Sequence, residues 1–527
     1  MALGLNDDGH NNTAIGLASM ASNTSGHYNS ALGVLSLYSN TTGTNNTTFG
    51  YLSMRFNTTG YSNVAIGTNS LYNNTTRSKL VAIGDSALYN NGTGVTLSWH
   101  ATRNTAVGSK TLYANTTGYD NTAGGSNALY SNTTGVSNTA NGSSALSSNT
   151  TGNNNTAIGA YTLLDNTTGY NNVAVGNNAL RSNTTGYYNI PSEVCALQLN
   201  TTGYYNTANG YNSLRNNTIG YHNTAMGYYS LYSNTTGDYN TAIGYYALYS
   251  NTDGLNNYAI GWRALEDNLV GDENVAIGTN ALSDITNSYN TAVGGRAGDY
   301  LNVNTTSSLY LGYDADASST AGAYNYSVAI GQRSRVSASQ QVRIGNGTSN
   351  AATSIGGPVG WSTVSDGRFK DNVQDNVPGI ELVTKLRPVT YNFDNEKLND
   401  YINTPDSCRD RESSAKDHQI VRTGFIAQEV EQAAKECGFN FSGVDAPKNE
   451  NDYYGIRYAE FVVPLVKATQ EQQEIIEEQD QINKEQQQTI EDQNQVNEQQ
   501  QQTIEQQQQT IENLLERIEA LEEQMNQ

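Results

Sequence analysis

The sequence predicts a mainly β protein, with a trimeric parallel β-roll or β-solenoid followed by a small α/β domain and a trimeric coiled coil. Three observations predict this fold class. Residues 12–296 repeat an Asn-x-Ala-Ile/Val-Gly pattern with a 17-residue period. The composition becomes that of an ordinary mixed domain near residue 365, and from Ile476 an apolar heptad pattern runs to the C-terminus.

Each repeat is too short to bury a core by itself, so about 17 neighbouring units must stack on one another. The units that begin at Asn155, Asn172 and Asn240 show the pattern, with Ala third, Ile or Val fourth and Leu ninth. Period-2 spacing indicates a short strand, and Asn-Thr-Thr-Gly indicates a turn in which Gly or Asn supplies a positive φ. We expect two strands and two turns per coil, and a rod of roughly 80 Å at ~4.8 Å per coil.

The alanine at the third position is predicted to point away from the Ile/Val face of its strand. A strand facing water would accept polar residues there, so a small residue in nearly every coil indicates a second tight contact, such as another chain. The alternative is an alanine kept small by a narrow solenoid interior. The residues leave both explanations open.

Tyrosines recur at three positions of the unit, and stacked coils would align them into columns. They follow the Leu, the turn Gly, or the Ile-Gly and Met-Gly pairs, as in Tyr72, Tyr89, Tyr113, Tyr130, Tyr170, Tyr187, Tyr204, Tyr228 and Tyr245. Exposed rings beside amides and hydroxyls can bind sugars, so a wall for a host-surface glycan is one interpretation. Ring-on-ring packing for stability is the other.

The net charge of −22 is unevenly distributed, with 12 basic and 16 acidic residues in 1–364 and 15 and 33 in 365–527. This leaves no basic footprint for nucleic acid. No Cys or His pair has ligand spacing, so we expect neither metal nor cofactor. No run of about 18 apolar residues exists, so we expect no membrane insertion. The start lacks the pattern of a secretory signal, which indicates assembly in a cytoplasm.

Residues 365–527 read as a small α/β domain and a long helix. We expect a helix over 377–386, a strand over 388–393, a polar loop over 397–416, a helix through 428–434 that ends near Gly438, and a last helix from about Tyr458. Heptads place isoleucines at a and glutamines or leucines at d, and apolar g residues favour three strands over two. The alternative is a single Gln-rich helix or a disordered tail.

One short segment at the composition boundary carries candidate chemistry: Ser365-Asp366-Gly367-Arg368-Phe369-Lys370. A serine needs a base to become nucleophilic, and a lysine can serve when it is neutral. Burial or nearby positive charge lowers a lysine pKa, and Arg368 is a candidate source of that charge. The alternative is a Ser-Asp helix cap beside a surface lysine.

The repeats resemble the heads of trimeric autotransporter adhesins, whose units carry an Asn/Ser-x-Ala-Ile-Gly signature. Ser327-Val328-Ala329-Ile330-Gly331 matches that signature closely. The resemblance covers about 12–346 and implies a left-handed parallel β-roll wound as a trimer. The 17-residue period is longer than the family's.

The C-terminal part resembles the intramolecular chaperone auto-processing domain found at the end of phage tail spikes and fibres. Four blocks agree in order over about 365–470. They are Ser365-Asp366-Gly367-Arg368-Phe369-Lys370-Asp371-Asn372-Val373, Leu386-Arg387-Pro388-Val389, Gly424-Phe425-Ile426-Ala427-Gln428-Glu429-Val430 and Tyr458-Ala459-Glu460-Phe461-Val462-Val463-Pro464-Leu465. The resemblance implies Ser365 as nucleophile, Lys370 as general base, Val364–Ser365 as the bond broken, and Asp366 and Arg368 as supporting residues.

We therefore expect a trimeric, phage-like fibre or appendage that attaches to a host surface, with a chaperone that removes itself in a single turnover. Its expected partners are two further copies, a host-surface glycan and other virion proteins, and its expected location is the virion. The alternative is a bacterial-type surface adhesin, or another structural β-roll, with a trimerisation domain that does not cleave. The expected divisions are 1–11 (N-terminal segment), 12–296 (β-roll), 297–364 (degenerate repeats and neck), 365–462 (chaperone domain) and 463–527 (helix and coiled coil).

Overall fold

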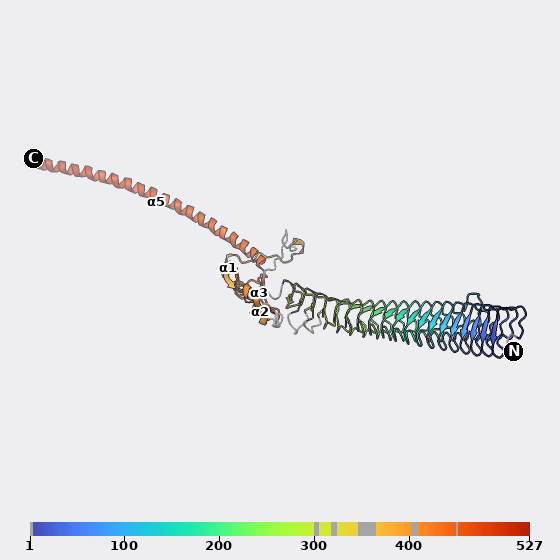
Figure 1. Cartoon of the computed structure of the whole chain (residues 1–527). Coiled ribbons are helices and arrows are strands. Elements are labelled where there is room, and N and C mark those ends of the chain that lie inside the picture. Colours follow the sequence, from blue (N-terminus) through green and yellow to red (C-terminus); the bar gives the residue numbers. More distant parts are fainter. Residues whose placement is uncertain are drawn as a thin grey trace. The chain divides into compact units, whose positions relative to one another are not determined.

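The computed structural model describes residues 4–299, 305–317, 324–345, 365–401, 409, 411–449 and 452–526. They belong to two compact units, Met1–Ser354 with Asp394–Asp417, and Ile355–Phe393 with His418–Gln527. Figure 1 shows the stacked coils of the first unit and the long C-terminal helix of the second.

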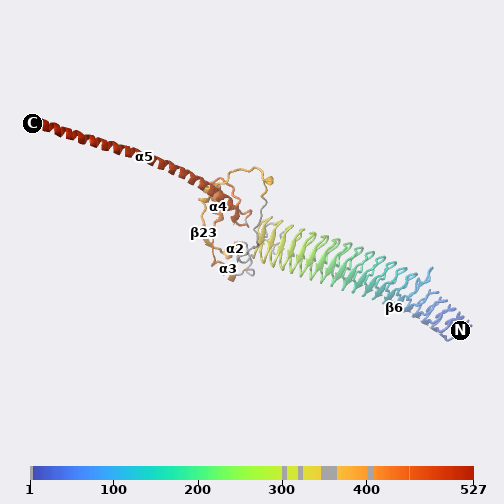
Figure 2. The same ribbon diagram turned by 90° about the horizontal axis from the view of Figure 1, so that it is seen from above.

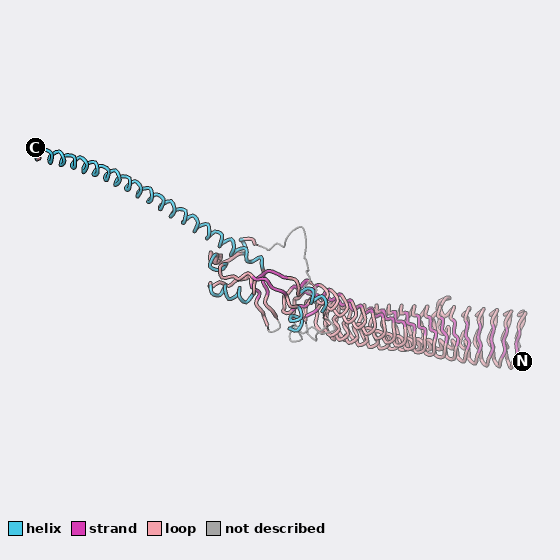
Figure 3. Tube along the Cα trace, turned by 60° about the vertical axis from the view of Figure 1, so that its left-hand side comes forward, coloured by secondary structure: helices cyan, strands magenta, loops and turns pink. Residues whose placement is uncertain are grey.

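The first unit is built on one parallel sheet of 20 short strands, each paired with the next along the chain. They are β1 (Thr13–Ile15), β2 (Ser30–Leu32), β3 (Thr47–Phe49), β4 (Val64–Ile66), β5 (Val81–Ile83), β6 (Thr105–Val107), β7 (Thr122–Gly124), β8 (Thr139–Asn141), β9 (Thr156–Ile158), β10 (Val173–Val175), β11 (Ile190–Ser192), β12 (Thr207–Asn209), β13 (Thr224–Met226), β14 (Thr241–Ile243), β15 (Tyr258–Ile260), β16 (Val275–Ile277), β17 (Thr291–Val293), β18 (Leu309–Leu311), β20 (Val328–Ile330) and β22 (Val342–Ile344). Two shorter strands, β19 (Asp316–Ala317) and β21 (Arg335–Val336), form a second parallel pair. In Figure 3 the strands follow one another along the stack.

The predicted parallel β-solenoid of 17-residue repeats is confirmed, but the prediction of two strands per coil is wrong. Between β1 and β17 each coil contains one three-residue strand, and turns make up the rest. Three residues per coil adopt left-handed backbone angles, as Asn178, Leu180 and Tyr188 do at φ 57°, 52° and 54°. Such angles turn the chain and cannot continue an extended strand.

The interior of the solenoid is formed by the small residues, which corrects one expectation. In β9 Ala157 is fully buried, whereas Ile158 is 43% exposed, and the ninth-position Leu163 is buried as well. The alanine therefore packs inside its own chain, and the narrow interior explains its size. The prediction that it contacts another chain is wrong.

The fourth-position residues instead form an apolar column on the outside of the solenoid, which we call the outward stripe. Its members are 37–58% exposed: Ile15, Leu32, Phe49, Val107, Ile158, Val175, Met226, Ile243, Ile260, Ile277, Leu311 and Ile344. Gly124, Asn141, Ser192 and Asn209 interrupt the column at β7, β8, β11 and β12. Exposed apolar surface of the kind formed by its other members is a common mark of an interface.

Buried asparagines connect each coil to the next through hydrogen-bonded ladders. Asn166 Nδ2 donates to Asn149 Oδ1 of the preceding coil at 2.8 Å and to Gly169 O of its own turn at 3.1 Å. Asn183 Nδ2 donates in turn to Asn166 Oδ1 at 2.7 Å. Buried amides are tolerated only when they are bonded, so the ladder allows a polar group inside every coil.

The glycine of the Asn-Thr-Thr-Gly turn is required by packing and does not supply a positive φ. A Cβ on Gly169 would lie 2.3 Å from Asn166 Oδ1 and 2.5 Å from Gly186 O. The positive φ falls two residues after the turn glycine, as at Asn171. The expected role of this glycine is therefore wrong, although its position in the turn is right.

The C-terminal residues form short elements and one long helix: η1 (Gly367–Phe369), α1 (Ile380–Val383), β23 (Val389–Asn392), α2 (Asn395–Tyr401), α3 (Arg411–Asp417), β24 (Val421–Gly424), α4 (Ala427–Glu436), β25 (Val444–Asp445), β26 (Gly455–Ile456), η3 (Tyr458–Phe461) and α5 (Val462–Met525). Strands β23 and β24 pair antiparallel, as do β25 and β26. A small core joins α1, α4 and η3 through Leu382, Val430 and Phe461. Figure 2 shows these elements from above.

The predicted polar loop over 397–416 is wrong, because the described residues there include α2 and α3. Asn395 Nδ2 donates to the carboxylate of Asp417 at 2.7 Å, and both side chains are buried. Lys416 and Glu412 form an ion pair one turn apart on α3, a spacing that favours a helix. Because these two helices are rich in charged residues, no apolar pattern marks them in the sequence.

Helix α5 has 64 residues and confirms the predicted C-terminal helix. One face packs on α1, where Glu471 accepts a hydrogen bond from Ile380 N at 2.7 Å and Ala468 is buried. The predicted a positions are exposed in the single chain, including Ile490 at 54% and Ile511 at 55%. No described helix is both long enough and apolar enough to cross a membrane.

Candidate functional site

Residues 365–370 form a tight turn that is fixed by an aspartate cap. Asp366 caps η1, and its Oδ1 accepts a hydrogen bond from Arg368 N at 2.9 Å. The Arg368 guanidinium also binds the Asp366 carboxylate, with Nη2 and Oδ2 2.6 Å apart. These hydrogen bonds hold the pKa of Asp366 below its ordinary value. The helix-cap interpretation therefore describes the backbone of this segment.

The turn brings the two residues predicted to react into direct contact. Lys370 Nζ lies 2.7 Å from Ser365 Oγ, within hydrogen-bonding distance. Lys370 ends η1, with its backbone N–H donating to Gly367 O at 3.2 Å. A nucleophile and a base need this spacing for proton transfer. Val364, the other residue at the predicted cleavage site, lies outside the described residues.

Arg368 is engaged by Asp366, so the nearest carboxylate compensates its positive charge. This geometry does not direct the guanidinium charge at Lys370.

The single chain leaves the Ser365–Lys370 pair in water. Both residues are exposed, and no residue of η1 is buried. Nearby apolar side chains are also uncovered, with Phe369 74% and Val373 82% exposed. Acyl transfer needs donors for the developing oxyanion in a site that excludes water. The described part of one chain therefore places the serine and the lysine in contact but does not enclose them.

The other three blocks of the resemblance meet in the fold. Arg387 Nε donates to Glu429 Oε2 at 3.0 Å, which joins the second block to the third. Phe425 N donates to Tyr458 Oη at 3.2 Å, which joins the third to the fourth. Gly424 allows this contact, since a Cβ there would lie 2.3 Å from Tyr458 Oη and would displace the hydroxyl group. These motif residues are therefore explained by packing.

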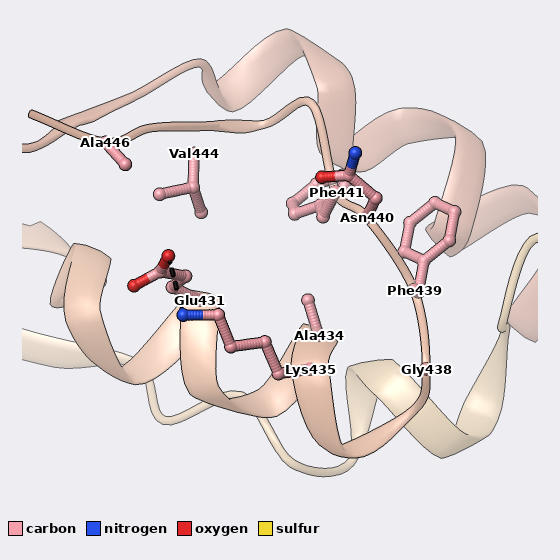
Figure 4. A pocket seen from close by; sticks show the side chains of 9 residues that line it. All are labelled: Glu431, Ala434, Lys435, Gly438, Phe439, Asn440, Phe441, Val444 and Ala446. Atoms are coloured by element: carbon pink, nitrogen blue, oxygen red, sulfur yellow. Dashed lines mark ion pairs between the residues drawn. The ribbon is translucent and has the colours of Figure 1, made fainter. Parts of the chain in front are cut away.

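A cavity of about 360 Å³ lies beside α4 and is drawn in Figure 4. Aromatic and apolar side chains, including Phe439 and Phe441, form one wall. On the other side Glu431 pairs with Lys435 at 2.8 Å. Neither Ser365 nor its lysine partner lines this cavity, so it is separate from the candidate cleavage site.

The tyrosine columns are present, and their rings stack on one another. Tyr170, Tyr187 and Tyr204 follow at centroid distances of 5.0 and 4.9 Å with nearly parallel planes. Each inner ring thus has its faces covered by neighbouring rings, which leaves edges and hydroxyl groups for water. This arrangement matches the ring-packing interpretation, and it leaves a free ring face only at the ends of a column.

Sequence reasoning missed a group of residues around the longest turn of the solenoid. Arg77, Lys79 and Trp99 line a hollow beside an inserted loop. The available signals were the insertion in one unit and an arginine where neighbouring units have glycine. Among the described residues no cluster of three His, Cys, Asp or Glu side chains is placed to hold a metal ion.

Residues 365–439 match the family described as "Chaperone of endosialidase", a peptidase family. A search of curated proteins finds no match. The family is an intramolecular chaperone with self-cleaving autoprotease activity. In this chain the match to the family follows a parallel β-solenoid in the sequence, and that order fits a protein of the phage tail-spike type.

Proposed function

We propose that the chain is one subunit of a trimeric phage fibre, and that its C-terminal domain guides assembly and then cuts itself off between Val364 and Ser365. One observation carries the proposal: the family match begins at Ser365, the residue whose hydroxyl contacts Lys370 Nζ. The solenoid is then the mature product. It is assembled in the host cytoplasm, carried on the virion and used to attach to a host surface.

The proposed cleavage begins with a neutral Lys370, which takes the proton of the Ser365 hydroxyl. Oγ attacks the carbonyl carbon of Val364, a C–O bond forms, and the C–N bond between the two residues breaks. Lys370 returns the proton to the departing Ser365 amine. Water then hydrolyses the ester, which gives a carboxylate on Val364 and restores the Ser365 hydroxyl.

Assembly is the proposed trigger because an exposed lysine stays charged near neutral pH. Burial disfavours the charged form and lowers a lysine pKa. Phe369 and Val373 flank the pair and are largely exposed in the single chain. When other chains cover these apolar groups, Lys370 loses water and becomes a base.

Both units present surfaces suited to a trimer. The outward stripe runs along the solenoid, and the apolar heptad residues of α5 are exposed as well. Parallel sheets of short repeats fold slowly and can pair in the wrong register. A coiled coil that aligns three chains before the solenoids zip together removes that ambiguity, and cleavage afterwards traps the fibre kinetically.

The test is expression of the full chain, followed by a denaturing gel and intact-mass measurement. Wild type should yield two pieces divided between Val364 and Ser365. Ser365→Ala should stay whole, and so should Lys370→Arg, because arginine keeps the charge but cannot give up its proton. Lys397→Ala, which alters an exposed lysine of α2, should cleave like wild type.

Two results would overturn the proposal. One is a wild-type trimer that remains whole. The other is a Lys370→Arg chain that cleaves at the wild-type rate, since the lysine could not then be the base.

A further inference from the structure

One coil of the solenoid carries a loop that the others lack. Val64 pairs with Val81 in the regular register of the repeats, but Val81 pairs with Thr105, and the chain between these two strands is longer than in the other coils. The extra residues leave the turn after Asn91 and return at Ala101, where Asn91 Nδ2 donates to Ala101 O at 2.9 Å. The bond from the asparagine to the carbonyl of its own turn is thus kept at the loop.

Arg77 replaces the turn glycine next to this loop and supports it. At the equivalent position one coil earlier, a Cβ on Gly60 would lie 2.5 Å from Arg77 O, so the column normally excludes side chains. The widened coil gives Arg77 the space that its neighbours lack. Its Nη1 donates to Leu97 O at 3.0 Å and to Ser98 O at 3.1 Å.

The loop destabilises the solenoid locally. Asn74 Oδ1 is buried and accepts no hydrogen bond, because the ladder is interrupted where the loop begins. An unpaired buried acceptor destabilises a fold, because it loses its hydrogen bonds to water and gains none in return. Local violations of this kind are expected mainly where function requires them.

The loop and the adjacent turns enclose a hollow of about 670 Å³, which is within the usual range for small-ligand sites. Trp99 and Tyr61 line it and are 50% and 47% exposed. Among the described residues Tyr61 stacks on no other ring, and Trp99 meets only the edge of His100. Unlike the rings of the tyrosine columns, these two have faces that a ligand can cover.

Basic residues also gather at the hollow, although the solenoid is nearly neutral. Residues 12–296 contain nine lysines and arginines, and three of them, Arg77, Lys79 and Arg103, line it. Asp120 compensates Arg103, with Nη2 and Oδ2 2.7 Å apart. Lys79 is exposed, and no described carboxylate lies within ion-pair distance of its ammonium group.

We infer that this hollow binds an acidic sugar, a carboxylate-bearing pyranose of a glycan chain. Lys79 attracts the carboxylate, and the faces of Trp99 and Tyr61 cover the C–H surface of the ring. The hydroxyl group of Thr76 in the wall is available to the sugar hydroxyls, whereas Thr102 Oγ1 already donates to Trp99 O at 2.7 Å and can only accept. The inference rests on the proposed attachment role and names the ligand class for it.

The test uses the full chain and calorimetric titration with oligogalacturonate and hyaluronan hexamers, each beside its carboxyl-methylated form. The acidic form of at least one hexamer should bind, and methylation should weaken that binding at least tenfold. Lys79→Gln and Trp99→Ala should each weaken it similarly. Lys110→Ala changes an exposed lysine outside the hollow and should leave affinity unchanged. Circular dichroism verifies that each variant is folded.

Several outcomes would overturn the inference. They are no binding of either acid, equal binding of acid and ester, full binding by Lys79→Gln, or displacement by inorganic phosphate at equal concentration, which would indicate a site for any small anion. Self-cleavage is measured on the same samples. Loss of binding with normal cleavage rejects only the ligand, whereas loss of cleavage in wild type rejects the proposed function.

Discussion

The asparagine ladder makes a prediction whose size follows from counting shared hydrogen bonds. Asn149→Ala removes three bonds: those to Asn132 Oδ1 and Gly152 O, and the one received from Asn166. Asn166→Ala also removes three, including that same bond. At about 1 kcal/mol of net stability per bond, each single variant should lose ~3 kcal/mol per subunit.

The double variant tests whether the ladder is one connected structure. Asn149→Ala with Asn166→Ala removes five bonds, because the bond between the two residues is counted once. The loss should be ~5 kcal/mol against ~6 for the sum of the singles, which is a coupling of ~1 kcal/mol. Asn200, three coils beyond Asn149, shares no bond with it, so that control pair should be additive to within ~0.5 kcal/mol.

The assay is guanidinium unfolding of the assembled protein, followed by circular dichroism, with unfolding rates measured on the same variants. Equal coupling in the neighbouring and the separated pair would refute the reasoning. So would single variants that lose less than ~1 kcal/mol, since they would show that buried asparagines are not held by these bonds.

Three further predictions concern the same solenoid and its partner domain. In the solenoid freed from α5, Ile158→Asp should weaken the trimer in sedimentation while Thr168→Asp, on the exposed turn, leaves it intact, because only the first puts a charge on the outward stripe. Gly169→Ala should destabilise by more than ~2 kcal/mol through its backbone clash, whereas Gly455→Ala, where a Cβ meets only an ordinary contact at 3.5 Å, should stay within ~0.5 kcal/mol by chemical unfolding. Burial raises the pKa of Asp299, so this carboxyl group should contribute less to stability as pH rises above ~4; the unfolding midpoint of wild type should therefore fall relative to that of Asp299→Asn between pH 4 and 7.

The sequence predicts the solenoid well because the fold repeats. Seventeen-residue spacing fixes which residues lie above one another, and Asn149, Asn166 and Asn183 align in the structure as the period requires. Periodicity does not state which face of a three-residue strand is inside. Both Ala157 and Ile158 are apolar, and only the width of the coil decides that the smaller one is buried.

Local chemistry was harder to predict where hydrogen bonds replace apolar contacts. Helices α2 and α3 are joined by buried polar groups such as Asn395 and Asp417, so no apolar period marks them. Gly169 looked like a residue needed for positive φ, although its turn requires only the absence of a side chain. In both cases the local structure depends on atoms of residues that are distant in the sequence or lie in the next coil.

At the candidate cleavage site the sequence predicts the contact between the serine and the lysine but not the environment of that contact. Five residues of separation are enough to place Ser365 beside Lys370, because Asp366 fixes the turn between them. The surroundings of a lysine decide whether it can act as a base, and among the described residues of one chain none encloses the pair, since Phe369 remains 74% exposed.

A single chain exposes apolar groups on three surfaces: the outward stripe, α5 and the surroundings of Ser365. Each is apolar and uncovered, and burying apolar surface is the dominant favourable contribution to association. Three aligned copies would cover all of them in one assembly event that begins at α5. If Lys370 is buried only in that event, cleavage depends on assembly. A chain without partners would then keep its chaperone domain, and a chain in a complete trimer would release it.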